Sequence, residues 1–442
     1  MTRLPSTIGL ALAVAVGLAS VARAQGPETD RESTSADGET DPGAAADEPV
    51  EGEEPEPAES PVAPVTADPT EDPPVGWGVI FQAGQGVSVS SDDERFRLVI
   101  SARGQFRGQV RAPADADASV DVLIRRARLD LSGHFFGEHN RFELELAFSP
   151  DDLGWSAETG VQRSPLLDYV LVFDYLRDLT LVVAQRKMPY ARERLVSSGA
   201  LAMLERSVVV SALRLDRDLG VWLRSDDLFG AGFLRYFAGV SAGEGRDGLV
   251  GDDANLAYSA RVEVLPLGLF DSYTQGDLQR RASARLAIGA SYVFLHESPW
   301  IDGLAGTRPE DGGTTDTHQA ALDVMFLWAG FSAEIDALLR WGERHPGTDG
   351  PVTPAQNGAG GLAQLSYLLP DTFVELSARY AMVLGLGDAT SLEDRGELGG
   401  AISLYFEGHP FKLQLDYFHL WDDFDAIERG EDRVRLQLQA TL

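Results

Sequence analysis

The chain has no cysteine among its 442 residues, and lysine occurs only at Lys187 and Lys412. The absence of cysteine fits an exported chain that does without disulfides. Long apolar runs are also missing, because after residue 24 no uninterrupted stretch approaches the ~20 residues that a membrane-spanning helix needs. If the protein crosses a membrane, strands must therefore do so.

The N-terminus carries the only short apolar run. Arg3 precedes residues 8–21, and Ala22-Arg23-Ala24 follows them. A basic head, an apolar centre and an A-x-A site predict a secretory signal peptide at 1–24, cleaved before Gln25. A membrane anchor is the alternative, but the run is short for one.

Residues 25–76 lack aromatic side chains and are rich in Pro, Ala, Glu and Asp. Between 26 and 76 the chain has 16 acidic residues and a single basic one, Arg31. Such a composition cannot bury enough apolar area to offset the entropy lost on ordering, so we expect a disordered linker. We interpret it as a passive periplasmic tether. Binding a cell-wall component or another partner is the alternative, for which no motif is present.

From 96 to 442, segments of roughly ten residues alternate apolar and polar side chains, as strands of a transmembrane barrel do. We therefore assign 77–442 to a barrel domain. The alternation predicts strands at 96–111, 121–135, 141–148, 166–175, 179–187, 218–225, 229–241, 255–265, 282–295, 317–328, 331–341, 361–369, 373–384, 397–406, 411–421 and 433–442.

The connections between these segments alternate between short turns and long polar loops. This rhythm is typical of an all-β, antiparallel, up-and-down transmembrane barrel of about 16 strands, with both termini on the periplasmic side. Closure of the barrel bonds every backbone group, which a bilayer requires. The stretch 266–281 is long where a short turn is expected, so the strand assignment can contain an error there. A soluble β-sandwich or propeller would also alternate, but it explains neither the signal peptide nor this rhythm.

The first full strand places arginines on one face. A charge on the lipid side is costly, so the polar face should line the lumen. Side chains two residues apart repeat at ~6.6–6.8 Å, which makes a ladder of guanidiniums. Strands 121–135 and 433–442 flank it once the barrel closes. The predicted anion pathway comprises Arg97, Arg103, Arg107, Arg111, Arg126, Arg128, Lys187, Arg433 and Arg435.

Such an arginine wall selects anions in a narrow pore and suits phosphate-like oxyanions. The alternative is a general porin in which an arginine wall faces acidic residues and sets a transverse field. The residues that could form that opposite wall are Glu143, Glu145, Asp168, Asp174, Glu334, Asp336 and Asp416.

The longest loop, 188–217, is too apolar for a solvated external loop. We expect this third long loop to fold into the lumen and narrow it; an external lid or a trimer contact is the alternative. Its candidate constriction residues are Arg192, Arg194, Arg206, Arg214 and Arg217.

No catalytic or metal-binding residues are predicted. The seven histidines are scattered without metal spacing. We therefore expect a protein that is not an enzyme and has no cofactor.

Several stretches resemble the phosphate- and pyrophosphate-selective outer-membrane porins, the O/P porins. The clear part covers about 120–225, and Gln185-Arg186-Lys187-Met188-Pro189-Tyr190 is similar to the family's Gly-Gln-x-Lys-x-Pro-Phe strand end. The other matching stretches are Arg125-Arg126-Ala127-Arg128-Leu129 with Gly133, Phe142-Glu143-Leu144-Glu145, Ser197-Ser198, Leu204-Glu205-Arg206-Ser207 and Arg217-Asp218-Leu219-Gly220-Val221.

The resemblance implies a trimeric channel of 16 strands with an inward third loop and a lysine ring at its constriction. Lys187 lies in the matching motif and is the candidate constriction lysine. Because lysine is nearly absent, a ring of several lysines cannot form, and Leu442 replaces the usual terminal aromatic residue.

We therefore expect an outer-membrane porin for passive diffusion of small anions such as phosphate. The expected partners are outer-membrane lipid, these anions and two further copies in a homotrimer, with no nucleic acid. A weakly selective general porin and a non-conducting structural or adhesive barrel are the alternative functions.

Overall fold

The computed structural model describes residues 76–442, apart from 157, 159, 249–254, 305 and 388–389. The predicted signal peptide and nearly all of the predicted linker lie outside these residues. In the part that is described, no helix is both long and apolar enough to cross a membrane.

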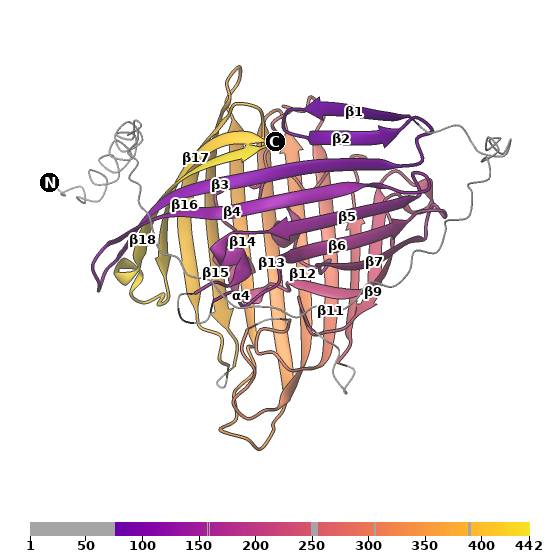
Figure 1. Ribbon diagram of the computed structural model, residues 1–442. Coiled ribbons are helices and arrows are strands. Elements are labelled where there is room, and N and C mark those ends of the chain that lie inside the picture. The colour runs from indigo at the N-terminus through magenta and orange to yellow at the C-terminus, as the bar shows by residue number, and fades with distance from the viewer. Residues whose placement is uncertain (1–75, 157, 159, 249–254, 305, 388–389) are drawn as a thin grey trace, which may run out of the picture. The chain divides into compact units, whose positions relative to one another are not determined.

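Sixteen antiparallel strands, β3 to β18, form a closed barrel (Figure 1). Each pairs with the next along the chain, and β18 returns to pair with β3. The first eight are β3 (Arg97–Pro113), β4 (Ser119–His134), β5 (Asn140–Ala147), β6 (Leu166–Phe173), β7 (Thr180–Lys187), β8 (Arg217–Ser225), β9 (Leu234–Ser241) and β10 (Ala257–Val264). The others are β11 (Arg285–Ser298), β12 (Thr314–Trp328), β13 (Phe331–His345), β14 (Gly358–Leu368), β15 (Val374–Gly385), β16 (Arg395–Tyr405), β17 (Phe411–Trp421) and β18 (Glu431–Thr441). The predicted 16-stranded barrel is confirmed.

A hairpin that the alternation did not reveal precedes the barrel. It consists of β1 (Trp77–Gln82) and β2 (Gly86–Ser91). The pairing of β18 with β3 covers residues 103–113 of β3, and β2 pairs with residues 97–100. The hairpin therefore covers a strand edge that would otherwise have unpaired backbone groups. Gly86 has φ +92°, and a Cβ there would lie 2.0 Å from the carbonyl oxygen of Ile100, so the turn requires glycine.

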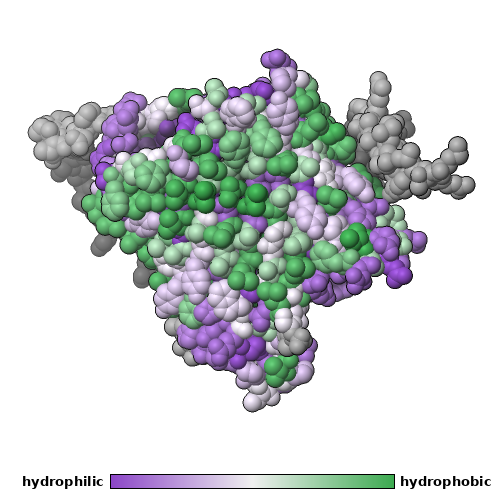
Figure 2. Space-filling model, turned by 180° about the vertical axis from the view of Figure 1, so that it is seen from behind, coloured by the Kyte–Doolittle hydropathy of each residue, from purple (hydrophilic) through white to green (hydrophobic). Residues whose placement is uncertain are grey.

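The alternation of each strand separates a polar inner face from an apolar outer one. On β13, Glu334 and Asp336 are buried, whereas Ile335 between them is 54% exposed. Apolar residues (green) spread over the outer wall in Figure 2. Because charge on the lipid side is unfavourable, this orientation suits a barrel in a membrane.

The two ends of the barrel differ, and we call them the turn end and the loop end. The turn end carries the C-terminus and the short connections, whereas the long connections lie at the loop end. The link 265–284 between β10 and β11 is long although it lies at the turn end. The register of β10 with β11 is regular throughout its eight pairs, so the predicted strand assignment contains no error at this link. Short helical turns are α2 (Pro150–Leu153), α3 (Arg192–Leu195), α4 (Val208–Leu213), η1 (Leu228–Gly230) and η2 (Ile427–Arg429).

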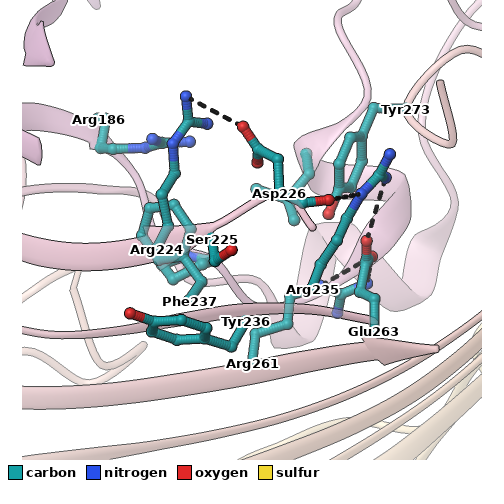
Figure 3. A pocket seen from close by; sticks show the side chains of 12 residues that line it. Arg186, Arg224, Ser225, Asp226, Arg235, Tyr236, Phe237, Arg261, Glu263 and Tyr273 are labelled. Carbon is teal, nitrogen blue, oxygen red and sulfur yellow. Dashed lines mark hydrogen bonds and ion pairs between the residues drawn. The ribbon is translucent and has the colours of Figure 1, made fainter. Parts of the chain in front are cut away.

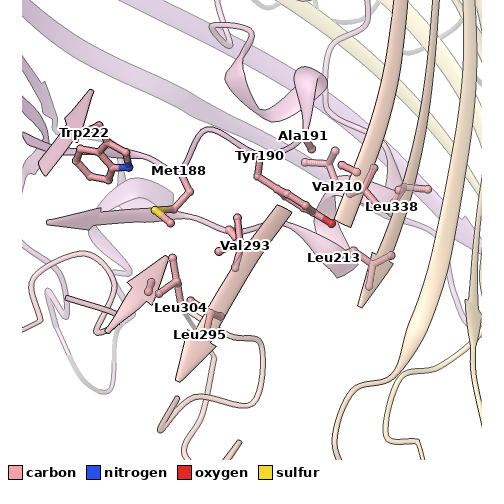
Figure 4. Close-up of a cluster of buried hydrophobic side chains, with 14 of the residues drawn as sticks. Met188, Tyr190, Ala191, Val210, Leu213, Trp222, Val293, Leu295, Leu304 and Leu338 are labelled. Atoms are coloured by element: carbon pink, nitrogen blue, oxygen red, sulfur yellow. The ribbon is translucent and has the colours of Figure 1, made fainter. Parts of the chain in front are cut away.

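The main hydrophobic cluster involves the segment between β7 and β8, residues 188–216, which we call L3. Val209, Val210 and Leu213 of α4 are buried in the same cluster as residues of β13, β14 and β15, which α4 contacts. Met188 and Tyr190 join the cluster from the start of L3 (Figure 4). A fully buried side chain of this kind contributes about 1.5–3 kcal/mol relative to exposure. Packing therefore fixes L3 against the barrel wall.

Candidate anion pathway

L3 lies along the polar face of the wall and is bonded to several strands. Its backbone carbonyls at 198, 201 and 202 accept hydrogen bonds from Gln105 Nε2 at 3.2 Å, Lys412 Nζ at 2.7 Å and Gln414 Nε2 at 2.9 Å. These donors belong to β3 and β17. Polar side chains of the wall thus satisfy backbone groups of L3 that packing has removed from water.

Arg192 anchors the start of L3 to the opposite part of the wall. Its fully buried guanidinium donates to Asp323 at 2.6 Å and to Glu263 at 2.9 Å. The third partner is the carbonyl of Ser272 in the 265–284 link, at 2.8 Å. The charge of this predicted constriction residue is therefore compensated by carboxylates.

Glu205 anchors the other part of L3. Its carboxylate is paired with Arg107 at 2.7 Å, Arg125 at 2.5 Å and Arg126 at 2.9 Å. Burial alone would raise the pKa of Glu205, but Arg126, Arg107 and Arg125 together hold that pKa well below its usual range. Glu205 therefore stays ionised and joins L3 to β3 and β4.

A β-bulge in β4 makes this triple contact possible. Gln105 of β3 pairs with Arg126, whereas the adjacent Phe106 pairs with Ile124, so Arg125 is the extra residue. A bulge changes the side-chain alternation. Arg125 and Arg126 are consecutive, yet both reach Glu205. Strict alternation would have placed Arg125 on the lipid side.

A cavity of about 500 Å³ lies between L3 and this part of the wall. Its lining includes twelve arginines: Arg107, Arg125, Arg126, Arg128, Arg163, Arg194, Arg206, Arg214, Arg217, Arg246, Arg433 and Arg435. Five carboxylates line it as well: Asp151, Asp152, Glu205, Asp216 and Glu397. The formal excess of seven positive charges (twelve minus five) makes this the candidate anion site.

Nine of the predicted pathway and constriction residues line this cavity, and five do not. The five are Arg97, Arg103, Arg111, Lys187 and Arg192. Arg97 donates to Ser88 of the hairpin at 3.2 Å, Arg103 to Ser197 of L3 at 3.1 Å, and Arg111 pairs with Asp121 at 3.3 Å. Arg217, predicted in the loop, is instead the first residue of β8. Arg125, Arg163 and Arg246 are lining residues that the sequence did not indicate.

Most of the arginine wall is compensated by carboxylates. Arg128 pairs with Glu145 at 2.5 Å, Arg435 with Asp416 at 2.7 Å, and Arg433 with Glu431 at 2.5 Å. Arg217 contacts Asp168 at 2.9 Å. Arg194 is paired with Asp216 of L3. Of the carboxylates expected on an opposite wall, Glu145, Asp168 and Asp416 thus neutralise arginines of the arginine wall itself, whereas Glu334 and Asp336 lie on β13 near Glu193.

Three cations that line the cavity have no such compensation. Arg163, Arg206 and Arg214 form no ion pair with any carboxylate of the described residues, and neither does the nearby Lys187, which does not line the cavity. Arg206 instead donates to the carbonyls of Glu193 at 3.0 Å and Val196 at 2.6 Å. Lys187 has Arg206, Arg194 and Arg217 as its main positive neighbours. The net positive charge of the site thus comes largely from the end of β7 and from L3.

Gln275 of the 265–284 link supports L3 from the turn end. Its Oε1 accepts from the amide of Ala202 at 3.0 Å, and its Nε2 donates to Glu334 at 2.6 Å. We expect Gln275→Ala to destabilise the docking of L3 by about 1–3 kcal/mol, because two buried polar groups lose their partner. Faster hydrogen exchange of the Ala202 amide would show that the docking of L3 is destabilised. An unchanged rate relative to the wild type, with Thr274→Ala as the neighbouring control, would contradict the supporting role.

Residues 100–273 match the family of phosphate-selective porins O and P. The resemblance to the O/P porins that the sequence predicts is confirmed over these residues. No curated protein matches the chain. The matched residues contain most of β3, all of β4 to β10 and L3, so they include most of the lining of the cavity described above.

Several solved porins share the fold of this chain. The anion-selective porin from Comamonas acidovorans has a TM-score of 0.52 at 11% identity, covering 78% of this chain and 99% of that one. The outer membrane channel DcaP of Acinetobacter baumannii gives 0.50 at 13% identity, with 78% and 97% covered. OmpF of Salmonella typhi, in complex with daunomycin, gives 0.50 at 12% identity, with 79% and 99% covered. These structures show that the chain shares the barrel fold of porins, and together with the family match over residues 100–273 they support an outer-membrane channel.

Proposed function

We propose that the barrel is a water-filled channel for passive diffusion of small anions, in particular phosphate and related oxyanions. The observation that carries the proposal is a cavity at which Arg163, Arg206 and Arg214 have no carboxylate partner, with the unpaired Lys187 beside Arg206. Oriented guanidiniums offer paired N–H donors to phosphate-like oxygens. The other arginines of the wall, including Arg97, Arg103, Arg107 and Arg111, would add to the positive field along the pathway.

In this proposal L3 narrows the lumen, and Lys187 lies at the narrowest part. The packing of α4 and the ion pairs of Arg192 and Glu205 support a fixed constriction rather than a mobile lid. We further propose that the loop end faces outward, that the linker lies in the periplasm, and that three copies assemble in the outer membrane. These assignments rest on the barrel rhythm and the family resemblance.

The experiment is a measurement of reversal potential for the purified protein in planar lipid bilayers under a potassium chloride gradient. For an anion channel, the reversal potential lies close to the equilibrium potential of chloride. Added phosphate or pyrophosphate then lowers the chloride current by competition. A reversal potential close to the equilibrium potential of potassium would contradict the anion proposal and favour a general porin. Absence of current from correctly folded protein would favour a non-conducting structural barrel.

A further inference from the structure

A second cavity lies on another part of the inner wall. It has a volume of about 200 Å³ and is formed by β7 to β10, L3 and the 265–284 link (Figure 3). It shares no lining residue with the larger cavity. Four arginines line it, Arg186, Arg224, Arg235 and Arg261, together with the apolar or aromatic residues Phe237, Tyr236, Tyr273, Pro189 and Leu195. Basic and apolar side chains thus meet in one small space.

Two of the four arginines are poorly compensated. Arg261 is paired with Glu263 and Asp323, and Arg235 lies 3.8 Å from Glu263. The guanidinium of Arg186, in contrast, has no hydrogen bond or ion pair with any residue that the structure describes, and that of Arg224 has only Asp226 at 3.6 Å. The Nε atoms of both are buried without a hydrogen-bond partner. Arg224 is the main charged neighbour of Arg186. Two partly buried like charges repel each other unless an anion lies between them.

The apolar part of the cavity determines which anion fits. The guanidinium carbon of Arg186 lies 4.9 Å from the centre of the Phe237 ring, so this ring already forms a cation–π contact. Pro189 and Leu195 of L3 and the ring of Tyr273 extend the apolar surface. A hydrated inorganic phosphate would gain little from these groups. A flat ring that carries one anionic group could contact them while its charge meets the arginines.

The volume of the cavity and the carboxylates that line it further restrict which anion can bind. At about 200 Å³ it is smaller than the roughly 300–1,000 Å³ pockets that hold drug-sized ligands, so a single ring suits it. Asp226 and Glu263 also line it, and they would repel a second negative charge on the ligand.

We infer that Arg186, Arg224 and Phe237 form a binding site for a small aromatic monocarboxylate, separate from the phosphate-type site. The carboxylate would bind between the two guanidiniums, and the ring would contact Phe237 and Tyr273. The inference rests on the proposed anion channel, to which it adds a class of organic solute. The O/P porin motif Gly-Gln-x-Lys-x-Pro-Phe leaves the position of Arg186 unspecified, so the site is a feature of this chain.

Benzoate and acetate are the probes, because they carry the same charge and differ in the ring. Each is added to planar bilayers that contain the full protein, and the concentration that halves the chloride current is measured. We expect benzoate to act at a concentration lower than acetate by roughly twofold to tenfold, the factor that one aromatic contact provides. Equal blocking concentrations would overturn the inference.

Two variants test the residues, and one serves as a matched control. Phe237→Leu keeps an apolar side chain in the packing but removes the ring, so it should abolish the difference between benzoate and acetate. Arg224→Gln should weaken the block by both. Arg177→Gln removes an arginine that is 68% exposed at the turn end and should change neither. Persistence of the benzoate preference in Phe237→Leu, or an unchanged block by both probes in Arg224→Gln, would overturn the assignment.

Calorimetric titration of the detergent-solubilised protein with benzoate separates this inference from the channel proposal. Binding that is lost in Arg224→Gln supports the site even if the reversal potential favours potassium, which would overturn only the anion channel. Anion preference without benzoate binding would overturn the site alone.

Discussion

Replacing Lys187 with glutamate is expected to lower the chloride-over-potassium permeability ratio about tenfold or more. The change places a negative charge beside Arg194, Arg206 and Arg217, where the unmodified chain has four neighbouring cations. At an effective dielectric constant near 20, two unit charges 4 Å apart interact by about 4 kcal/mol, and about 1.4 kcal/mol corresponds to tenfold. Even partial screening by water and salt leaves a large effect. Reversal potentials in planar bilayers measure it, and competition by phosphate should weaken in parallel.

Graded variants at the same position make this result specific to charge. Lys187→Arg should keep the anion preference and Lys187→Gln should be intermediate. Arg177→Glu reverses an exposed charge at the turn end and is the matched control. If Lys187→Glu and Arg177→Glu shifted the reversal potential equally, Lys187 would have no special place in the pathway.

Alternation was enough to predict the barrel because each strand separates a lipid face from a water face. All sixteen predicted strands correspond to β3–β18, and the lumen position of Glu334 and Asp336 follows from the same rule. The hairpin β1–β2 escaped prediction because its role depends on where β18 stops along β3, which is a property of register. The bulge at Arg125 escaped for the same reason, since it depends on how β3 and β4 pair.

The candidate site was only partly predictable. Alternation indicated that Arg107, Arg126 and Arg128 share one face, but the sequence does not show which carboxylates approach them. Glu205 lies in L3 and Glu145 on β5, so their contacts depend on tertiary packing. The arginines that looked most exposed to the lumen are therefore largely compensated. The uncompensated charges at Arg163 and Arg214 could be recognised only from the absence of an ion pair in the folded chain.

Replacing Glu205 with glutamine is expected to loosen L3 by about 3–5 kcal/mol, the usual effect of removing one partner from a buried ionic cluster. Arg107, Arg125 and Arg126 would lose their shared carboxylate and repel one another. The hydrophobic packing of α4 would remain, so we expect partial release of L3 instead of unfolding of the barrel. Trypsin should then cleave within L3 faster, and single-channel current should fluctuate more.

The pH dependence of the same contact provides an independent check. The pKa of Glu205 is lower in the folded chain than its ordinary value, so its contribution is fully present above that ordinary value and is lost only as pH falls through the lowered one. Acidification from pH 7 to about 5 should therefore leave L3 of the wild type resistant to a protease active at both values. Glu138→Gln, at an exposed turn residue, is the control and should behave as the wild type does. Equal cleavage rates for Glu205→Gln and Glu138→Gln would show that hydrophobic packing alone holds L3, and the carboxylate would then act only through its charge on the ions that pass.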